Sequence, residues 1–475
     1  MADEQKQFFQ QVEELLDIGD KKSLSAILVD QRSSDISEVI EIINNDQRRI
    51  VFDLLDKHIS AEVLEKVDEA TRSELFEIFE EEELTDLISE LNPDDAADVL
   101  SELPQQESQE VLEHMPEAEA DKIKDLMSYS EDSAGGIMDP VMVSVSENDT
   151  VSEAIRQIQN TDIDEDFFSV FVVNSQGQFL GDVRIQDLIR KREDTPIKQL
   201  VETDTIYVNV DTDQEEVRNV FSKNDLIVVP VLDINNILVG RITADRVIEV
   251  AEEEAAEDIY VMAGTDAAEL ENISAIHAAR VRMTWLLPCL AGTAVTAVVY
   301  LTFKNIFIES LHLPVYMTAI AFAPMIAAIS GNAGLQTSAI VVSGLATGDL
   351  AALRISQVFS REVRVALFVA LSCGIIGGVI CGLLPNLLEN NLTADITEKP
   401  INLQDHLRIV LAFSTAMFSA IMVSTTLGLF LPFLFRKIKI DPAISSGPLV
   451  TTANDSISVV IYLTLVLLLV QIAGP

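Results

Sequence analysis

The stretch DPAISSGPLVTTANDSISVVIYLTLVLLLVQI, residues 441–472, places an acidic side chain inside an apolar segment. Residues 449–472 are long enough to cross about 30 Å of hydrocarbon, which takes roughly 20 residues of helix. Asp455 lies about 1.5 turns into this segment, and no Lys or Arg is near it in the sequence. An acid at membrane depth usually marks an ion pathway. The alternative is a carboxylate that is protonated or hydrogen-bonded where two helices meet.

Four further apolar stretches precede this one, so the sequence predicts a membrane domain with five spans. They cover residues 283–303, 314–345, 363–384 and 409–435. The second is too long for one upright crossing and contains Pro324, followed by GNAGLQTS at residues 331–338. Small, polar and helix-breaking residues are tolerated at membrane depth where they face protein or a watery pathway. Helix contact without further function is the alternative for these residues.

The basic residues of the loops predict how the spans are oriented, because cytoplasmic loops carry an excess of Lys and Arg. Eight of them fall on the side of the N-terminal half, and three fall on the other side. The eight are Arg280, Arg282, Arg354, Arg361, Arg364, Arg436, Lys437 and Lys439, and the three are Lys304, Lys399 and Arg408. We therefore expect a multi-pass protein of the inner (plasma) membrane with a cytoplasmic N-terminus and an outward C-terminus.

The formal charge of −45 is concentrated upstream of Glu271, where acidic side chains far outnumber basic ones. So negative a surface repels phosphate backbones, which excludes nucleic acid as a partner. Periodic Leu, Ile and Val in the same half argue against disorder. The three cysteines all lie in apolar stretches downstream of Glu271 and indicate neither a disulfide framework nor a thiolate metal site.

Residues 1–135 alternate Leu-rich helical segments with short breaks, which predicts a solenoid-like stack of short helices. Pro93, Pro104 and Pro116 recur at nearly even intervals within it. We expect each proline at the first position of a helix, where its missing N–H costs nothing. An irregular helical bundle is the alternative arrangement.

A duplicated unit follows the helical stack. The run FLGDVRIQDLI at residues 179–189 matches LVGRITADRVI at residues 238–248. Upstream of each run, a helix with an acidic start is followed by a strand rich in valine. The sequence therefore predicts two β-α repeats, at residues 136–200 and 201–248.

The second repeat leads into an acidic helical stripe, expected within a connecting helix at residues 249–277. Asp245, Glu249, Glu253 and Glu257 are spaced four positions apart, and like charges at this spacing oppose a helix. A hard divalent cation such as Mg²⁺ or Ca²⁺, held between this stripe and another acidic surface, would relieve the repulsion. A solvated acidic helix is the alternative. The further acidic residues concerned are Glu252, Glu254 and Asp258 beside the stripe, and Asp94, Asp95 and Asp98 in the helical domain.

Taken together, these features resemble the MgtE family of magnesium channels and transporters, and the paired repeats resemble tandem CBS domains. The resemblance rests on YSEDSAGGIM (129–138), EAAEDI (254–259), GNAGLQ (331–336) and the segment from DPA (441–443) to Asp455. It implies a multidomain, mainly α protein. Its expected parts are a cytoplasmic α-helical superhelix (1–135), an α/β tandem CBS pair (136–248), an acidic connecting helix (249–277) and a five-helix transmembrane domain (278–475).

The resemblance further implies a homodimer in the lipid bilayer with one pore at the dimer interface. Asp455 of each subunit would hold a hydrated Mg²⁺, with a backbone oxygen of Thr451 one turn earlier. The connecting helix would close the pore when internal Mg²⁺ binds the cytoplasmic domains. The residues that match this regulatory role are Glu249, Glu254, Glu257 and Asp258, with Asp94, Asp95 and Asp98 as partners.

Two departures from the family pattern bear on regulation. Arg246 stands where the family often has an acidic residue, so one regulatory ion site is either lost or replaced by an ion pair. CBS modules that bind adenosine nucleotides often place Ser or Thr three positions before an Asp. Here Arg184 precedes Asp187 and Thr243 precedes Arg246 at that spacing, so we do not expect ATP binding.

The function expected from the sequence is Mg²⁺ uptake through a Mg²⁺-selective channel that internal Mg²⁺ closes. A gradient-coupled secondary transporter for divalent cations is the alternative, although Asp455 is the one carboxylate deep within a span. A membrane sensor without transport would not need Asp455. The sequence indicates no enzyme, because it contains no Gly-rich phosphate loop with a lysine, no nucleophile elbow and no histidine pair at ligand spacing.

Overall fold

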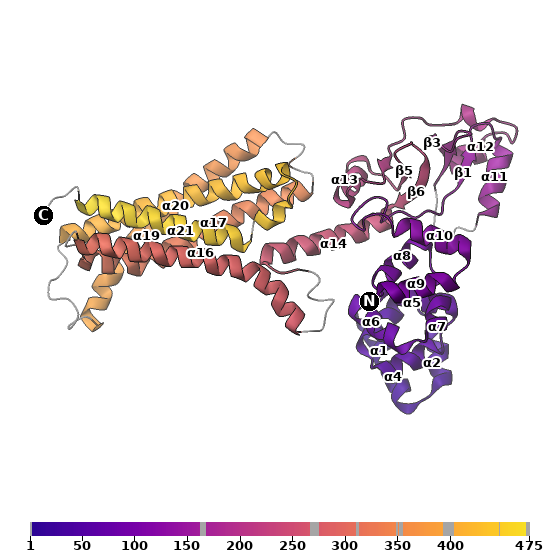
Figure 1. Cartoon of the computed structure of the whole chain (residues 1–475), viewed down its shortest axis with the longest axis horizontal. Coiled ribbons are helices and arrows are strands. Elements are labelled where there is room, and N and C mark those ends of the chain that lie inside the picture. Colours follow the sequence, from indigo (N-terminus) through magenta and orange to yellow (C-terminus); the bar gives the residue numbers. More distant parts are fainter. Residues whose placement is uncertain are drawn as a thin grey trace. The chain divides into compact units, whose positions relative to one another are not determined.

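A computed structural model describes residues 2–161, 168–266, 275–309, 313–347, 350, 355–392, 403–445 and 447–471. The chain divides into two compact units, Met1–Glu253 and Glu254–Pro475 (Figure 1). Each unit has its own hydrophobic core. The predicted fold class is confirmed, with a stack of short helices, a pair of β-α repeats and five long apolar helices.

The first unit begins with short helices that pack in a stack, and their buried faces carry Leu, Ile and Val. Most of them start at an acidic or amide residue; Asn44, Asp56 and Asp68, for example, each accept a hydrogen bond from a backbone N–H of the first turn. The helices are α1 (Ala2–Ile18), α2 (Lys21–Leu28), α3 (Ser33–Ile42), α4 (Asn45–Phe52), α5 (Lys57–Lys66), α6 (Glu69–Ile78), α7 (Glu81–Ile88), α8 (Pro93–Ser101), α9 (Gln105–His114) and α10 (Glu117–Leu126).

The prolines of this stack do not all occupy the predicted position. Pro93 is the first residue of α8, as expected. The prediction is wrong for Pro104 and Pro116, which lie one residue before α9 and α10 with ψ of 136° and 132°. The proline ring fixes φ near −65° but does not fix ψ. Proline therefore suits both the first residue of a helix and the residue before it, and the sequence does not distinguish the two.

The two repeats form two three-stranded sheets of the same topology (Figure 1). In each sheet the middle strand pairs in parallel with the first strand and antiparallel with the third. The strands are β1 (Ser144–Ser146), β2 (Ser169–Val173) and β3 (Phe179–Arg184), then β4 (Val208–Asn209), β5 (Val228–Leu232) and β6 (Leu238–Thr243). The helices are α11 (Val151–Asn160), α12 (Ile185–Arg190), η1 (Ile197–Gln199), α13 (Gln214–Asn224) and α14 (Ala244–Ala263).

A buried ion pair ties the segment before the first sheet to the last strand of the second. The Arg241 guanidinium donates to Asp139 at 2.8 Å, and the two side chains are 4% and 8% exposed. The backbones of the same two residues also exchange hydrogen bonds. Because a buried charge is costly without a partner, this pair holds the two repeats in one arrangement.

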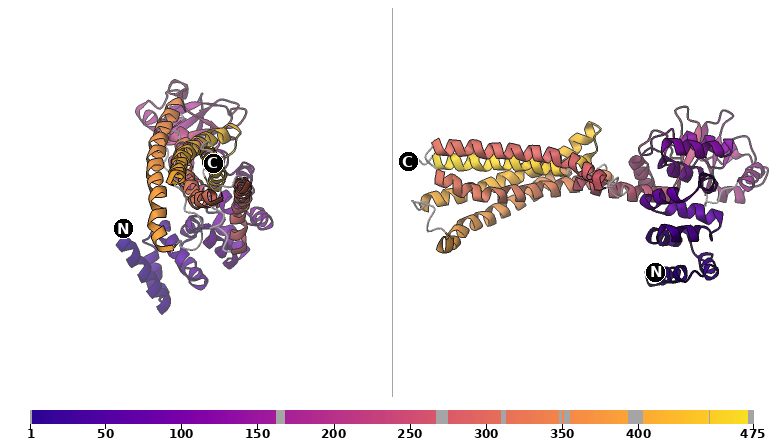
Figure 2. Two further views of the ribbon diagram at one scale, coloured as in Figure 1. Left: turned by 90° about the vertical axis from the view of Figure 1, so that its left-hand side faces the viewer. Right: turned by 60° about the horizontal axis from the view of Figure 1, so that its bottom comes forward.

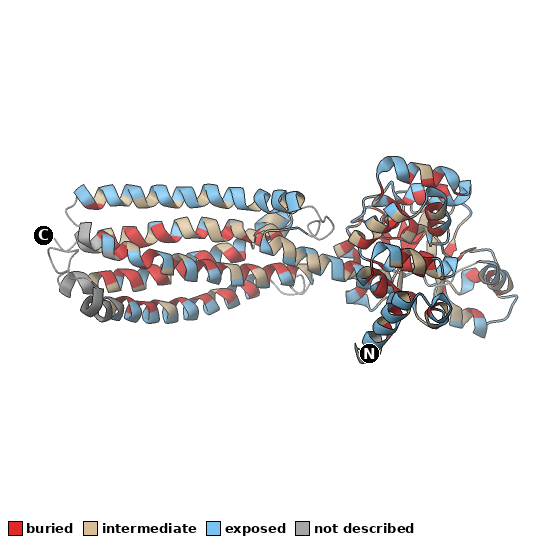
Figure 3. Ribbon diagram, turned by 90° about the horizontal axis from the view of Figure 1, so that it is seen from below, coloured by how far each residue is buried: buried red, intermediate tan, exposed pale blue. Residues whose placement is uncertain are grey.

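The second unit contains five helices that are long and apolar enough to cross a membrane, which confirms the five predicted spans. Figure 2 shows the long helices of this unit running side by side. They are α16 (Ala275–Glu309), α17 (Leu313–Ala346), α19 (Ile355–Leu392), α20 (Leu403–Lys437) and α21 (Pro448–Gln471), with the 3₁₀ turn η2 (Pro442–Ser445) before the last. α17 continues through Pro324 without a break. Of the residues described along α16, Phe307 alone is buried (Figure 3).

Glycines let α17 and α20 approach closely. A Cβ placed on Gly428 would lie 2.3 Å from the carbonyl oxygen of Gly334, and a Cβ on Gly334 would lie 2.2 Å from Ser424 Oγ. Small residues at such a crossing bring helix backbones into contact, as membrane helices require in the absence of a strong hydrophobic drive. This crossing fixes one wall of the helix bundle that carries Asp455.

Candidate ion site and acidic cluster of the first unit

The carboxylate of Asp455 lies about two turns into α21 and is neither fully buried nor fully exposed. Its Oδ1 is 3.7 Å from the position that a Cβ on Gly331 would take, and Thr451 Cγ2 is 3.4 Å from that same position. Asp455, Thr451 and Gly331 of α17 therefore meet in one place. Within the part of the chain that the structure describes, the Asp455 carboxylate has neither a hydrogen bond nor an ion pair.

Thr451 lies one turn before Asp455 on the same helix. Because α21 is continuous from Pro448, the carbonyl of Thr451 is opposite the amide of Asp455 in the helical ladder. A carbonyl oxygen has two lone pairs, so the ladder leaves one of them for a ligand. This is the arrangement in which a backbone oxygen and a carboxylate can share one hydrated ion.

The end of the acidic helix α14 contacts the start of α21 within the second unit. A Cβ on Gly447 would lie 3.0 Å from the carbonyl oxygen of Met262, and a Cβ on Gly264 would lie 2.6 Å from Pro448 Cγ. Gly264 has a φ of 79°, in the left-handed region that suits glycine. Side chains at these two glycines would separate the segments, so the contact depends on both.

Arg246 lies among the acidic residues where α14 begins beside α8. Arg246, in the first turn of α14, pairs with Asp98 of α8 at 2.5 Å and with Glu249 at 3.1 Å. Its side chain is 20% exposed. The positive charge of Arg246 also acts on the neighbouring Asp94 and Asp95. An ion pair is thus present at Arg246, one of the two outcomes that the departure from the family pattern led us to expect.

Burial is the largest influence on the pKa values of the acidic residues on and next to α8, namely Asp94, Asp95 and Glu102. It raises the pKa of Asp94 well above its usual range, with Asp95 and Asp139 adding to the rise. Burial also raises the pKa of Asp95 to about 7, and it raises that of Glu102 to about 7 against the opposing charge of Arg72, with which Glu102 forms an ion pair. Asp94 Oδ1 is buried without a hydrogen-bond partner among the described residues.

The cluster is not built as a cage for a metal ion. Among the residues that the structure describes, no group of three or more His, Cys, Asp or Glu side chains is arranged to hold one. At this position the guanidinium of Arg246 supplies the positive charge instead.

The other predicted regulatory residues lie farther along α14. Glu254, Glu257 and Asp258 belong to the second unit, whereas Glu249 belongs to the first. Residues 267–274 of the expected connecting helix lie outside the described residues, as do Arg354 and Lys399, on which part of the orientation depends.

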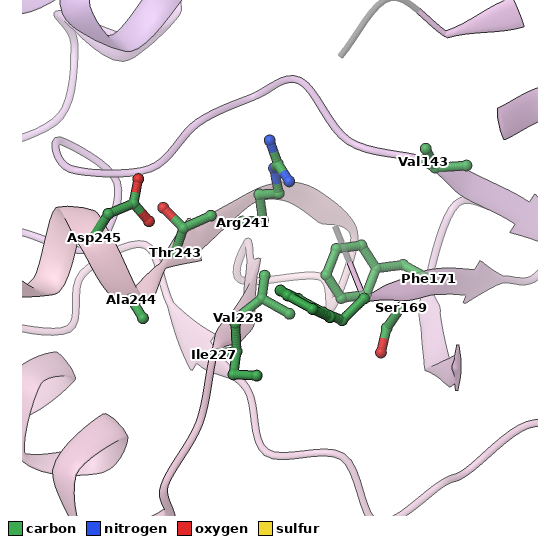
Figure 4. Close-up of a pocket in the computed structure, with 10 residues that line it drawn as sticks. Val143, Ser169, Phe171, Ile227, Val228, Arg241, Thr243, Ala244 and Asp245 are labelled. Carbon is green, nitrogen blue, oxygen red and sulfur yellow. The ribbon is translucent and has the colours of Figure 1, made fainter. Parts of the chain in front are cut away.

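Residues of both repeats line a partly open cavity of about 330 Å³ (Figure 4). Its walls include Phe168, Phe171 and Ile227, with Thr243 and Asp245 on one side. The spacing typical of nucleotide-binding CBS modules does not indicate this pair, because Thr243 and Asp245 are only two positions apart. The signal for the pair is a Thr that ends β6 with an Asp in the first turn of α14.

Family models match three parts of the chain. "Divalent cation transporter" matches residues 323–465, "MgtE intracellular N domain" matches 31–132, and "CBS domain" matches 134–194 and 197–253. The chain is 30% identical to the "Magnesium transporter MgtE" of Thermus thermophilus over 352 residues, which are 73% of this chain and 72% of that relative. The chain belongs to the MgtE family of magnesium transporters. It is thus a membrane protein of a transporter family and not of an enzyme class.

Other MgtE proteins are similar to a comparable extent. The "Magnesium transporter MgtE" of Bacillus subtilis is 28% identical over 338 residues, 71% of this chain and 69% of that one. Two solved structures are similar to about half of this chain. The "soluble part of a magnesium transporter" is 25% identical with a TM-score of 0.48, and covers 53% of this chain and 99% of that one. The "cytosolic domain of the Mg2+ channel MgtE in complex with ATP" is 30% identical with a TM-score of 0.49, and covers 51% and 99%.

The buried carboxyls of this MgtE chain predict that its first unit becomes less stable as the pH rises. Between about pH 4 and 7, folded Asp95 and Glu102 hold protons that the unfolded chain has released. The folded chain then binds more protons, so the free energy of unfolding falls as the pH rises. In thermal denaturation of the full chain with a chelator, we expect a lower Tm at about pH 8 than at about pH 5.5. Glu102→Gln should flatten this decline, and exposed Glu107→Gln should not; equal slopes in both variants would contradict the assignment.

The Arg246 ion pairs predict a second stability effect. Arg246→Ala leaves Asp94, Asp95, Asp98 and Glu249 without their cation, which should cost about 1–3 kcal/mol of unfolding free energy in chelator. Added Mg²⁺ should then raise the Tm of the variant more than that of the wild type, because the variant has more uncompensated charge. Arg184→Ala, which breaks the exposed pair with Glu202, is the matched control. If the two variants responded alike to chelator and Mg²⁺, Arg246 would have no special role in the cluster.

Proposed function

We propose that the protein is a Mg²⁺-selective channel for magnesium uptake, which closes when internal Mg²⁺ is high. The observation that carries the proposal is Asp455, a carboxylate in a membrane span that lies beside Gly331 and Thr451. An unpaired carboxylate at this depth is costly unless it is wet or binds a cation. Mg²⁺ loses its water shell reluctantly and is usually held through one or two carboxylates with several waters retained.

The proposal includes a homodimer in the inner membrane, with the N-terminus in the cytoplasm. One Asp455 supplies a single carboxylate, and a second from the dimer partner would face it across the pore. Two carboxylates attract a divalent cation more strongly than a monovalent one. The basic residues of the loops support the orientation.

For closure, we assign Mg²⁺ to the acidic surface of the cytoplasmic half and of α14. Divalent cations that collect on this surface offset the repulsion along the stripe that contains Glu249 and Glu257. The contact of Gly447 with Met262 supports a role for the end of α14 near the start of α21. A ligand shifts a conformational equilibrium only if it binds one state more tightly, so Mg²⁺ must bind the closed state better.

The cavity between the repeats bears on the nucleotide expectation. Its apolar walls suit a planar ring, but Asp245 in its lining would repel a triphosphate. The cation in the same lining, Arg241, is already paired with buried Asp139. We therefore keep the expectation that this chain does not bind ATP.

Asp455→Asn tests the ion site. The amide keeps the size of the side chain and removes the charge. We expect Mg²⁺ influx into liposomes loaded with a Mg²⁺ indicator to fall at least about tenfold. That is the loss expected when a direct ion contact worth about 1.4 kcal/mol or more is removed. Asp441→Asn is the matched control, because Asp441 accepts a hydrogen bond from the Ala443 N–H and lies before the span. Undiminished influx through Asp455→Asn would show that the ion passes elsewhere.

Recordings from the reconstituted protein separate the channel from the coupled transporter. Neutralising Glu254, Glu257 and Asp258 together should leave unitary currents that no longer fall as cytoplasmic Mg²⁺ rises, because the charges that Mg²⁺ offsets are gone. The control removes the same number of charges on α10, with Glu117→Gln, Glu119→Gln and Asp121→Asn. Unchanged inhibition in the first variant would refute the role of α14. Uptake without unitary currents, driven by a proton or sodium gradient, would favour the transporter.

A further inference from the structure

A buried polar network lies directly behind the ion site. Ser330 of α17 and Asn454 and Ser458 of α21 are all fully buried. Asn454 Nδ2 donates to Ser330 Oγ at 3.0 Å, and the hydroxyls of Ser330 and Ser458 are 2.8 Å apart. Ser330 in turn donates to the carbonyl of Ile326 at 2.7 Å. The network therefore links the two helices and is anchored to the backbone of one of them.

We propose that Asn454 is a positioning residue that holds Asp455 toward the ion path, a role that rests on the proposed function of Asp455. The argument begins with the helix: successive residues point roughly 100° apart. Once Asn454 is locked against α17, the direction of Asp455 is set as well. Rotation of α21 about its axis would break the Asn454–Ser330 hydrogen bond before it could turn Asp455 away.

On α17, as on α21, a residue of the buried network is followed directly by a residue at the ion site. Ser330 meets Asn454, and the next residue, Gly331, meets Asp455 at the distances given above. On each helix a locked polar residue thus precedes one that borders the ion site. Gly331 has no side chain to fill the space beside the carboxylate, which leaves room for an ion that keeps its water molecules.

A role in helix packing alone predicts a different outcome from a role in positioning. Hydrogen bonds between membrane helices are individually weak, so removing one should lower the amount of folded protein only modestly. A packing role would scale the maximal flux with the amount of folded protein and leave the Mg²⁺ dependence unchanged. A positioning role changes how the site holds the ion, and so moves the Mg²⁺ concentration for half-maximal flux.

The test measures Mg²⁺ flux against Mg²⁺ concentration for purified full-length variants in liposomes, normalised to folded protein. Asn454→Leu keeps the volume of the side chain and removes its hydrogen bonds, and it should raise the half-saturating Mg²⁺ concentration at least about fivefold. Asn454→Ser keeps a small hydrogen-bond donor, so its half-saturating concentration should lie closer to that of the wild type. Tyr316→Phe is the matched control. It removes the hydrogen bond from Tyr316 to the Tyr300 carbonyl, which also joins two spans but lies about 20 Å along α17 from Ser330.

The outcomes distinguish this inference from the proposed function. If Asp455→Asn abolishes flux while Asn454→Leu behaves like Tyr316→Phe, Asn454 is a packing residue and only this inference fails. If Asp455→Asn conducts normally, the proposed ion site itself fails. Should Asn454→Leu not fold, Ser330→Ala decides, because it removes the shared acceptor with a smaller change. An unshifted half-saturating concentration in Ser330→Ala would overturn the inference.

Discussion

A carboxylate taken out of water costs several kcal/mol unless a proton, a cation or retained water offsets the loss. Both units of this protein are organised by that constraint. In the first unit, Asp98 pairs with Arg246 and the pKa of Asp94 rises well above its usual range. In the second, Asp455 has no partner among the described residues, and an ion with its water shell is the partner that the proposed function assigns to it.

A carboxylate paired with an arginine and a carboxylate paired with a dissolved ion differ in how they respond to ion concentration. A guanidinium is covalently part of the chain, so its contribution at Asp98 is independent of ion concentration. A carboxylate that depends on a dissolved cation responds to the concentration of that cation. Arg246 offsets only part of the acidic charge around the start of α14, since Asp94, Asp95, Asp98 and Glu249 all lie near it. In the proposed function, the response to Mg²⁺ depends on the acids that Arg246 leaves uncompensated.

Much of the fold can be predicted from the sequence, because it depends on patterns within single segments. The five spans follow from apolar length, and the two repeats follow from the match between residues 179–189 and 238–248. The contacts between segments cannot be predicted in this way. Asn454 and Ser458 are four positions apart on one helix face, but nothing in the sequence indicates that Ser330 is their partner. Pro104 and Pro116 lie one position from where we expect them because their fixed φ suits both positions.

The site is predicted unevenly for the same reason. Asp455 can be recognised from the sequence alone, because it is an acidic residue within an apolar stretch. The cavity lined by Thr243 and Asp245 escapes a search that requires a fixed spacing, because the fold needs only proximity. The ion pair between Arg246 and Asp98 joins residues 148 positions apart. Only a tertiary structure can supply such a pairing.

The 20-residue helix α14 is unbroken, yet the boundary between the two compact units falls within it, between Glu253 and Glu254. A loop at that boundary would absorb an added residue. A helix cannot, because each added residue advances its far end by about 1.5 Å and turns it by roughly 100°. Within the helix, an added residue would therefore move every residue that follows it to a different face. The length of this segment should accordingly be as constrained as its charge.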